Sequence, residues 1–132
     1  MKKILIVDDD KKTAATLSIR LKASGYETLT AADGLEGLKL ALSSRPDLII
    51  MDIWMPGGVG VLIAERLKRV GLAHVPVIFL TASKAKEVWR IAAETDPARV
   101  LEKPCDPPQL LEAVQQVLAQ APSSVPGING RP

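Results

Sequence analysis

The sequence predicts an α/β fold, a doubly wound (βα)5 sandwich in which helices cover both faces of a five-stranded parallel sheet. Short apolar runs alternate along the chain with longer segments whose apolar residues recur at helical spacing. The runs at residues 4–7 and 48–51 contain no polar residue, which is typical of strands buried on both faces of a parallel sheet. This alternation favours right-handed crossovers, but the pattern alone leaves the order of the strands open.

Length and composition indicate one globular domain. The chain has 132 residues, of which 47% are apolar, so it can bury a hydrophobic core without the help of disulfides or structural metal ions. A single cysteine, Cys105, excludes an internal disulfide, and no apolar stretch approaches the length of a membrane span. The net charge of +2 is too small to indicate nucleic-acid binding. We expect a domain over residues 1–121, followed over 122–132 by a disordered tail or truncated linker.

Local signals define the elements in the first half of the chain. After the first strand, Asp9 or Asp10 can N-cap a helix, and Gly25 suits the position just beyond its end. A strand with polar residues between apolar ones follows, as expected at a sheet edge. Asp33 and Glu36 then have the spacing of a capping box at the start of the second helix.

The second half begins where Pro46 ends the second helix. The third strand follows, and Gly71 is expected to stop the third helix. Ser83 can cap the fourth helix, and Asp106 the last one, with Pro107 in its first position. The expected strands span residues 4–7, 27–31, 48–52, 75–80 and 99–102, and the expected helices 11–24, 34–45, 59–70, 84–93 and 107–121.

Four helices are expected to turn their periodic apolar residues towards the sheet, while the helix at 84–93 is only weakly amphipathic. The residues assigned to these inward faces are Ala14, Leu17, Leu21 and Ser24; Leu35, Leu38, Ala41 and Leu42; Leu62, Ile63, Leu67 and Val70; and Leu110, Val114, Val117, Leu118 and Ala121.

Polar residues stand at the ends of four of the strands and should meet at one edge of the sheet. They are Asp8 and Asp9, Asp52, Thr81 and Lys103. Clustered carboxylates repel one another unless a cation joins them, and oxygen ligands suit Mg²⁺. A lysine and a hydroxyl beside them can hold phosphoryl oxygens, and an aspartate can form an aspartyl phosphate. The pattern therefore indicates phosphoryl transfer onto a carboxylate.

Four segments in this order resemble the receiver domain of two-component response regulators. They are residues 4–10 (ILIVDDD), 46–56 (PDLIIMDIWMP), 77–82 (VIFLTA) and 101–104 (LEKP), and the resemblance covers roughly residues 2–120. It implies a flavodoxin-like fold, similar to chemotaxis regulators, with strand order 2-1-3-4-5.

The resemblance also implies roles for the residues at the strand ends. Asp52 would accept a phosphoryl group from a phosphohistidine on a sensor histidine kinase or phosphotransfer protein. Asp9 would bind Mg²⁺ directly, together with Asp52 and the backbone carbonyl of Trp54, and Asp8 would act mostly through water. Thr81 would close onto the phosphoryl group. Lys103 would pair with a phosphoryl oxygen, and its bond to the following proline would be cis.

Three positions depart from the family pattern. Val100 stands where the family often has tyrosine or phenylalanine, so the usual aromatic output switch is missing. Val59 stands where the loop after the acceptor strand usually has aspartate, so this loop is expected to be more mobile. Trp54 is a bulky neighbour of Asp52 and is expected to hinder the approach of a water molecule that attacks the phosphorylated Asp52.

The resulting hypothesis is a cytoplasmic regulatory domain that catalyses only its own phosphorylation and dephosphorylation. It would signal to a protein partner or a missing output domain, without contacting nucleic acid or membrane directly. A phosphatase of the haloacid dehalogenase type is disfavoured, because it needs an acid at the position of Trp54. A pseudo-receiver, a protein-interaction module that needs no phosphorylation, remains the alternative. For Trp89, a core position and a partner surface are equally open.

Overall fold

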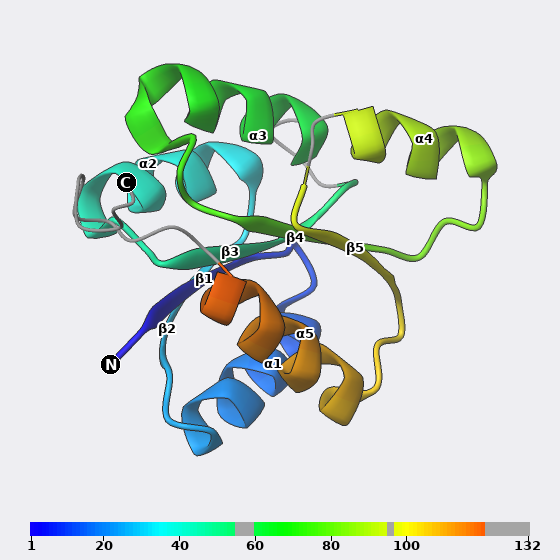
Figure 1. Cartoon of the computed structure of the whole chain (residues 1–132). Coiled ribbons are helices and arrows are strands. Elements are labelled where there is room, and N and C mark those ends of the chain that lie inside the picture. Colours follow the sequence, from blue (N-terminus) through cyan, green and yellow to red (C-terminus); the bar gives the residue numbers. More distant parts are fainter. Residues whose placement is uncertain (55–59, 95–96, 121–132) are drawn as a thin grey trace.

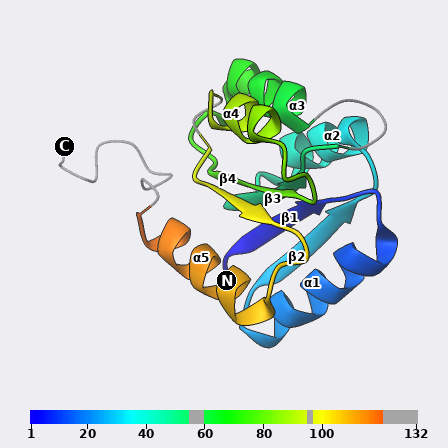
Figure 2. The same ribbon diagram turned by 90° about the vertical axis from the view of Figure 1, so that its right-hand side faces the viewer.

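The computed structural model describes residues 1–54, 60–94 and 97–120, in which a parallel five-stranded sheet lies between two layers of helices. The strand order is β2-β1-β3-β4-β5, which confirms the predicted topology. Helices α1 and α5 cover one face, and α2, α3 and α4 cover the other (Figures 1 and 2). The strands are β1 (Lys3–Val7), β2 (Glu27–Ala31), β3 (Leu48–Asp52), β4 (Val77–Thr81) and β5 (Arg99–Glu102). The helices are α1 (Lys11–Ala23), α2 (Gly34–Ser44), α3 (Gly60–Leu67), which continues into the wider turn η1 (Lys68–Leu72), α4 (Lys86–Glu94) and α5 (Pro107–Gln120).

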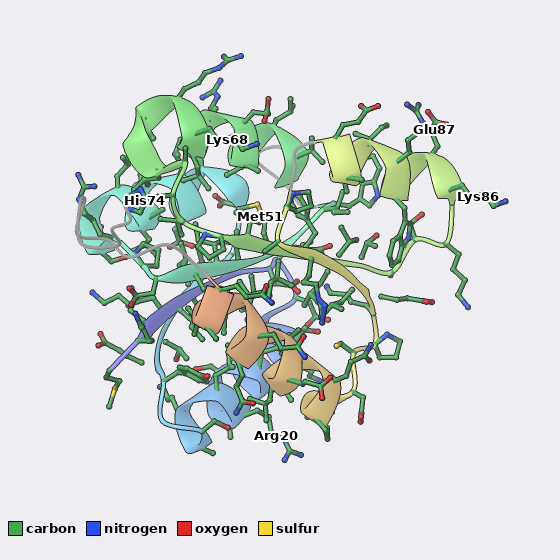
Figure 3. All side chains as sticks on the ribbon, in the orientation of Figure 1. Arg20, Met51, Lys68, His74, Lys86 and Glu87 are labelled. Atoms are coloured by element: carbon green, nitrogen blue, oxygen red, sulfur yellow. The ribbon has the colours of Figure 1, made fainter. Side chains whose placement is uncertain are left out.

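The central strands build two hydrophobic cores, one on each face of the sheet. Along β1, Leu5 contributes to the core beneath α2 and α3, and Ile6 to the core against α1 and α5. β3 alternates in the same way, with Met51 on the first face and Ile50 on the second. Met51 lies within the helix-covered interior in Figure 3, whereas Lys86 points away from it. Each such side chain contributes roughly 1.5–3 kcal/mol when fully buried, so these strands hold the sheet edge rigidly in place.

Polar caps fix where the first two helices begin. Of the two candidates for α1, Asp10 is the cap, because its Oδ1 accepts hydrogen bonds from the backbone N–H groups of Lys12 and Thr13. Asp33 accepts from the N–H of Glu36 at the start of α2, as the spacing predicted.

The inward faces predicted for α2 and α3 are partly wrong. Leu35, Leu42, Leu62 and Val70 are exposed, and small residues face the sheet instead. A Cβ added to Gly37 of α2 would lie 2.9 Å from the Val7 methyl groups, so this helix lies too close to β1 for a leucine at that point. Periodicity identified the helices correctly. It did not identify the residues that contact the sheet, because α2 lies so close to β1 that only small residues such as Gly37 and Ala41 fit between them.

The third helix loses regular geometry at the predicted stop. Gly71 has φ +92°, a left-handed conformation that glycine adopts without strain. The expected mobile loop around Val59 and the expected tail at 122–132 lie outside the described residues. None of the helices in the described part of the chain has the length and apolar character needed to cross a membrane.

Candidate functional site

Four strands bring the predicted site residues to one edge of the sheet. Asp52 and Thr81 end β3 and β4, while Asp8 and Lys103 directly follow β1 and β5. The pairing of Asp52 with Leu80 across β3 and β4 keeps these strand ends level. The residues from four distant parts of the sequence therefore share one location because the strands are parallel and in register.

The ammonium group of Lys103 lies between two carboxylates. Its Nζ donates a hydrogen bond to Asp8 Oδ2 at 2.7 Å and another to Asp52 Oδ2 at 3.2 Å. Asp8 is only 2% exposed and Asp52 only 9%, so water screens these charges weakly. The lysine is the counter-ion for two acidic groups that burial would otherwise disfavour.

The backbone orients the remaining carboxylate oxygens. The N–H of Asp10 donates to Asp8 Oδ1 at 2.9 Å, and the N–H of Trp54 donates to Asp52 Oδ1 at 3.4 Å. Each carboxylate is therefore held by a lysine on one oxygen and a local amide on the other. This arrangement positions both groups before any ligand binds.

Burial and charge act against each other at Asp52. Burial raises the pKa of Asp52 above its ordinary value, and the positive charge and hydrogen bond of Lys103 only partly oppose this effect. Burial alone would lower the pKa of Lys103, but the hydrogen bond to Asp8 and the charge of Asp52 outweigh it and raise that pKa. The lysine is thus firmly cationic, while the Asp52 anion lacks full compensation.

Three carboxylates at this edge have the composition of a site for a hard cation. One oxygen from each of Asp8, Asp9 and Asp52 lies within 4.8 Å of the others, and Asp9 is exposed to solvent. Carboxylate oxygens are the ligands that Mg²⁺ prefers, and the uncompensated charge of Asp52 would gain from a second cation. The donor set therefore fits Mg²⁺. A contribution from the carbonyl of Trp54 stays a prediction.

Thr81 is fully buried at the end of β4, and its hydroxyl is engaged with the following loop. Its Oγ1 accepts a hydrogen bond from the N–H of Ser83 at 3.1 Å. The Ser83 hydroxyl in turn accepts from the N–H of Ala85 at 3.1 Å. The helix α4 begins only at Lys86, and the carbonyl of Ala85 accepts its first hydrogen bonds, so Ser83 forms a turn before α4 and the predicted cap is wrong. The bond between Lys103 and Pro104 is cis, as the resemblance implied.

Gly60 is a site residue that the sequence interpretation missed. A Cβ added there would lie 2.4 Å from the backbone oxygen of Asp52, and the Gly60 N–H donates to the carbonyl of Ile53 at 2.6 Å. The first turn of α3 thus lies directly against the backbone at the end of β3. A third glycine two residues after the sequence Pro56-Gly57-Gly58 could have indicated this contact.

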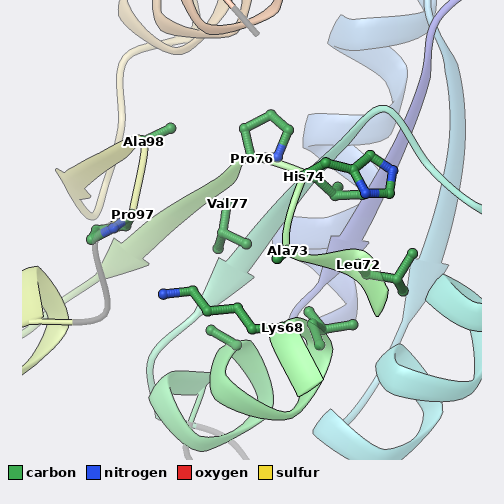
Figure 4. A pocket seen from close by; sticks show the side chains of 11 residues that line it. Lys68, Leu72, Ala73, His74, Pro76, Val77, Pro97 and Ala98 are labelled. Atoms are coloured by element: carbon green, nitrogen blue, oxygen red, sulfur yellow. The ribbon is translucent and has the colours of Figure 1, made fainter. Parts of the chain in front are cut away.

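His74 lies far from the carboxylates. It precedes β4 and lines a cavity of about 330 Å³ together with Lys68 and Pro97 (Figure 4). This cavity lies at the end of β4 opposite Thr81, so the length of the strand separates the imidazole from Asp52. The geometry therefore gives His74 no part in chemistry at Asp52.

The site joins a partly desolvated carboxylate, a fixed ammonium group and a place for a divalent cation. Such a site is suited to an acceptor carboxylate that attacks a phosphoryl group, because positive charge is available on both sides of the developing anion. A second acid for hydrolysis of an external substrate is missing two residues after Asp52, where Trp54 stands.

Comparison with known proteins agrees with this geometry. The polar-differentiation response regulator DivK of Brucella anthropi is 35% identical over 121 residues, which cover 91% of this chain and 98% of DivK. The alkaline phosphatase synthesis transcriptional regulatory protein PhoP of Bacillus subtilis is 32% identical over 125 residues, and the chain spans only 52% of PhoP.

Solved structures and the family model extend the agreement to the whole fold. A CheY-like response regulator receiver domain protein from Methanospirillum hungatei superposes with a TM-score of 0.87 at 27% identity, covering 92% of this chain and 96% of that one. The family model of the response regulator receiver domain matches residues 4–115. Fold, strand-end residues and sequence similarity together show that this chain belongs to the response regulator receiver domain family.

Proposed function

We propose that the chain accepts a phosphoryl group on Asp52 in a Mg²⁺-dependent reaction and signals by a change of conformation. The observation that carries the proposal is the position of the Asp52 carboxylate, which is buried, oriented by an amide and 3.2 Å from the ammonium group of Lys103. If Asp52 only formed an ion pair with Lys103, no further carboxylates would be needed beside it. Asp8 and Asp9 nevertheless lie at the same edge, which gives the group of three carboxylates that a cation site requires.

In the proposed reaction an oxygen of Asp52 attacks the phosphorus of a phosphohistidine on a sensor histidine kinase or phosphotransfer protein. The new bond joins phosphorus to the Asp52 oxygen, the bond between phosphorus and the histidine nitrogen breaks, and the imidazole keeps its electron pair. Lys103 would then pair with a phosphoryl oxygen, and the buried hydroxyl of Thr81 would donate to another.

Asp8, Asp9 and Asp52, with the carbonyl of Trp54, would hold Mg²⁺. Bound Mg²⁺ would supply positive charge to the phosphoryl oxygens. Asp8 already shares Lys103 with Asp52, so the protein itself fixes the distance between the acidic cluster and the acceptor.

We infer that this domain acts in the cytoplasm, on a downstream protein or on an output domain of a longer chain. The relatives support both forms. DivK has nearly the length of this chain, while PhoP, named as a transcriptional regulatory protein, is about twice as long. The kinase class, the partner and the location are proposals that rest on this family membership.

Intact mass after incubation with acetyl phosphate tests the proposal. We expect one phosphoryl adduct that needs Mg²⁺, is absent in Asp52→Asn and is present in Asp47→Asn. Asp47 is the matched control, because it directly precedes the same strand at its opposite end, where it accepts a hydrogen bond from the N–H of Lys3. Adduct on Asp52→Asn would refute the acceptor assignment. No adduct on the wild type, together with no beryllofluoride binding, would favour the pseudo-receiver.

A further inference from the structure

Ser83 joins the end of β4 to α4 through three hydrogen bonds. Its N–H donates to Thr81 Oγ1 at 3.1 Å, and its own hydroxyl accepts from the N–H of Ala85 at 3.1 Å. Its carbonyl accepts from the indole Nε1 of Trp89 at 2.8 Å. Ser83 therefore connects the buried hydroxyl of Thr81 directly to an aromatic side chain on α4.

Trp89 is suited to transmit a displacement of this loop. Its indole has a single donor, and that donor is used on the Ser83 carbonyl, at a distance typical of a good hydrogen bond. The ring is half-buried, so its position depends on its neighbours in the protein. Its two side-chain torsions make it stiff, so a shift of Ser83 must either move the ring or break the bond.

The strand β5, which lies next to β4, carries no aromatic residue. In the register of β4 and β5, Val100 pairs with Phe79 and Glu102 pairs with Thr81. Val88 and Ala92, on α4, pack against the same core as Val100. The aromatic group that contacts the loop after Thr81 therefore comes from α4.

We propose that Trp89 is a positioning residue that couples the state of Asp52 to α4 through Ser83 and Thr81. This inference rests on the proposed function. A hydroxyl can accept one hydrogen bond and donate another, so Thr81 can bind the Ser83 N–H and a phosphoryl oxygen together. Movement of the Thr81 side chain towards a group on Asp52 carries Oγ1 with it, so the bound Ser83 N–H follows, and the Trp89 indole follows through the Ser83 carbonyl.

The test observes both indole N–H signals in a ¹H–¹⁵N spectrum. The chain contains two tryptophans, so Trp89→Phe assigns the signals. Mg²⁺ and beryllofluoride serve as the phosphoryl mimic, and ¹⁹F signals report whether it is bound. The indole signal of Trp54 is the internal control for occupancy of the site, because the backbone N–H of this residue donates to Asp52 Oδ1.

In the wild type we expect both indole signals to shift when the mimic binds. Thr81→Ala should bind the mimic more weakly, so it is compared at the concentration where its ¹⁹F signals show a filled site. There the Trp54 signal should still shift while most of the Trp89 shift is lost, and Thr81→Ser, which keeps the hydroxyl, should restore it. Two results would overturn this inference without touching the proposed function. One is a Trp89 indole shift in Thr81→Ala as large as in the wild type. The other is no shift of the Trp89 indole signal in the wild type while beryllofluoride is bound. Absence of any bound fluoride signal in the wild type would overturn the proposed function with it.

Discussion

Lys103 Nζ lies closer to Asp8 than to Asp52, at 2.7 Å compared with 3.2 Å. The lysine is therefore anchored on a carboxylate that is not the proposed acceptor, and it reaches the acceptor from that anchor. Asp8 thus fixes the lysine beside Asp52 before any phosphoryl group arrives. Substitutions of Lys103 and of Asp52 should therefore have different effects on the stability of the protein.

Lys103→Ala should destabilise the protein by about 2–3 kcal/mol at pH 7, because it leaves two buried carboxylates without their counter-ion. Urea unfolding measures the effect, and added Mg²⁺ should reduce it by replacing the lost charge. Lys84→Ala is the control, since Lys84 pairs with Glu102 on the exposed surface at 3.6 Å and should contribute less than about 1 kcal/mol. Equal effects of the two substitutions would contradict the anchoring role.

Asp52→Asn should stabilise the metal-free protein, and increasingly so as the pH rises. The pKa of Asp52 is raised in the fold by burial, so the native state holds a proton that the unfolded chain releases from about its ordinary pKa of 3.8 upwards. The wild type therefore loses stability as the pH rises through this range, and asparagine does not titrate. Unfolding free energies of both proteins between pH 4 and about pH 7 test this sign. A difference that shrinks with rising pH would contradict it.

Asp9→Asn should weaken Mg²⁺ binding while leaving the fold intact, because Asp9 is exposed and belongs to the carboxylate cluster. In the wild type, Mg²⁺ at a hundredfold excess over Kd should stabilise the native state by about 2.7 kcal/mol. Asp10→Asn is the matched control, since asparagine caps a helix about as well as aspartate. Thermal unfolding with and without Mg²⁺ should show a reduced metal response only for Asp9→Asn. A full response in that variant would exclude Asp9 as a ligand.

Gly60→Ala should destabilise the protein by about 1–3 kcal/mol and slow phosphorylation of Asp52. The new methyl group would collide with the backbone oxygen of Asp52, which cannot move without shifting the acceptor itself. Gly37→Ala is the comparison, because its methyl group would meet the buried methyl groups of Val7 and not the backbone of Asp52, so it should lose stability but keep the labelling rate. Chemical unfolding and the rate of acetyl phosphate labelling distinguish the two. If both variants lose the same stability and keep the same rate, the backbone contact is unimportant.

Local sequence signals were sufficient for the strands and for the residues at their ends, whereas the order of the strands came from the family resemblance. Continuous apolar runs identified β1 and β3, and parallel strands must place Asp8 and Asp52 at one edge. The sequence narrowed the N-cap of α1 only to Asp9 or Asp10, because either carboxylate can accept hydrogen bonds from the first N–H groups of the helix. The hydrogen bonds in the structure select Asp10.

The rest depends on distances that periodicity does not contain. Leu62 has helical spacing but is exposed, and Gly60 lies against the backbone of Asp52 instead. Likewise, Trp89 was equally open as core or surface residue, and the structure shows a half-buried ring whose indole binds the loop after β4. Such contacts depend on how closely two elements approach, which a single sequence pattern does not specify.

The pairing of Asp8 with Lys103 joins residues 95 positions apart, which directly follow β1 and β5. During synthesis the ribosome releases the acidic residues long before the lysine is made. Until β5 docks, the carboxylates stand without their counter-ion, and contacts over such long sequence separation form late. We therefore expect a nascent or truncated chain to be a poor acceptor, and the ability to signal to arise only when β5 has joined the sheet.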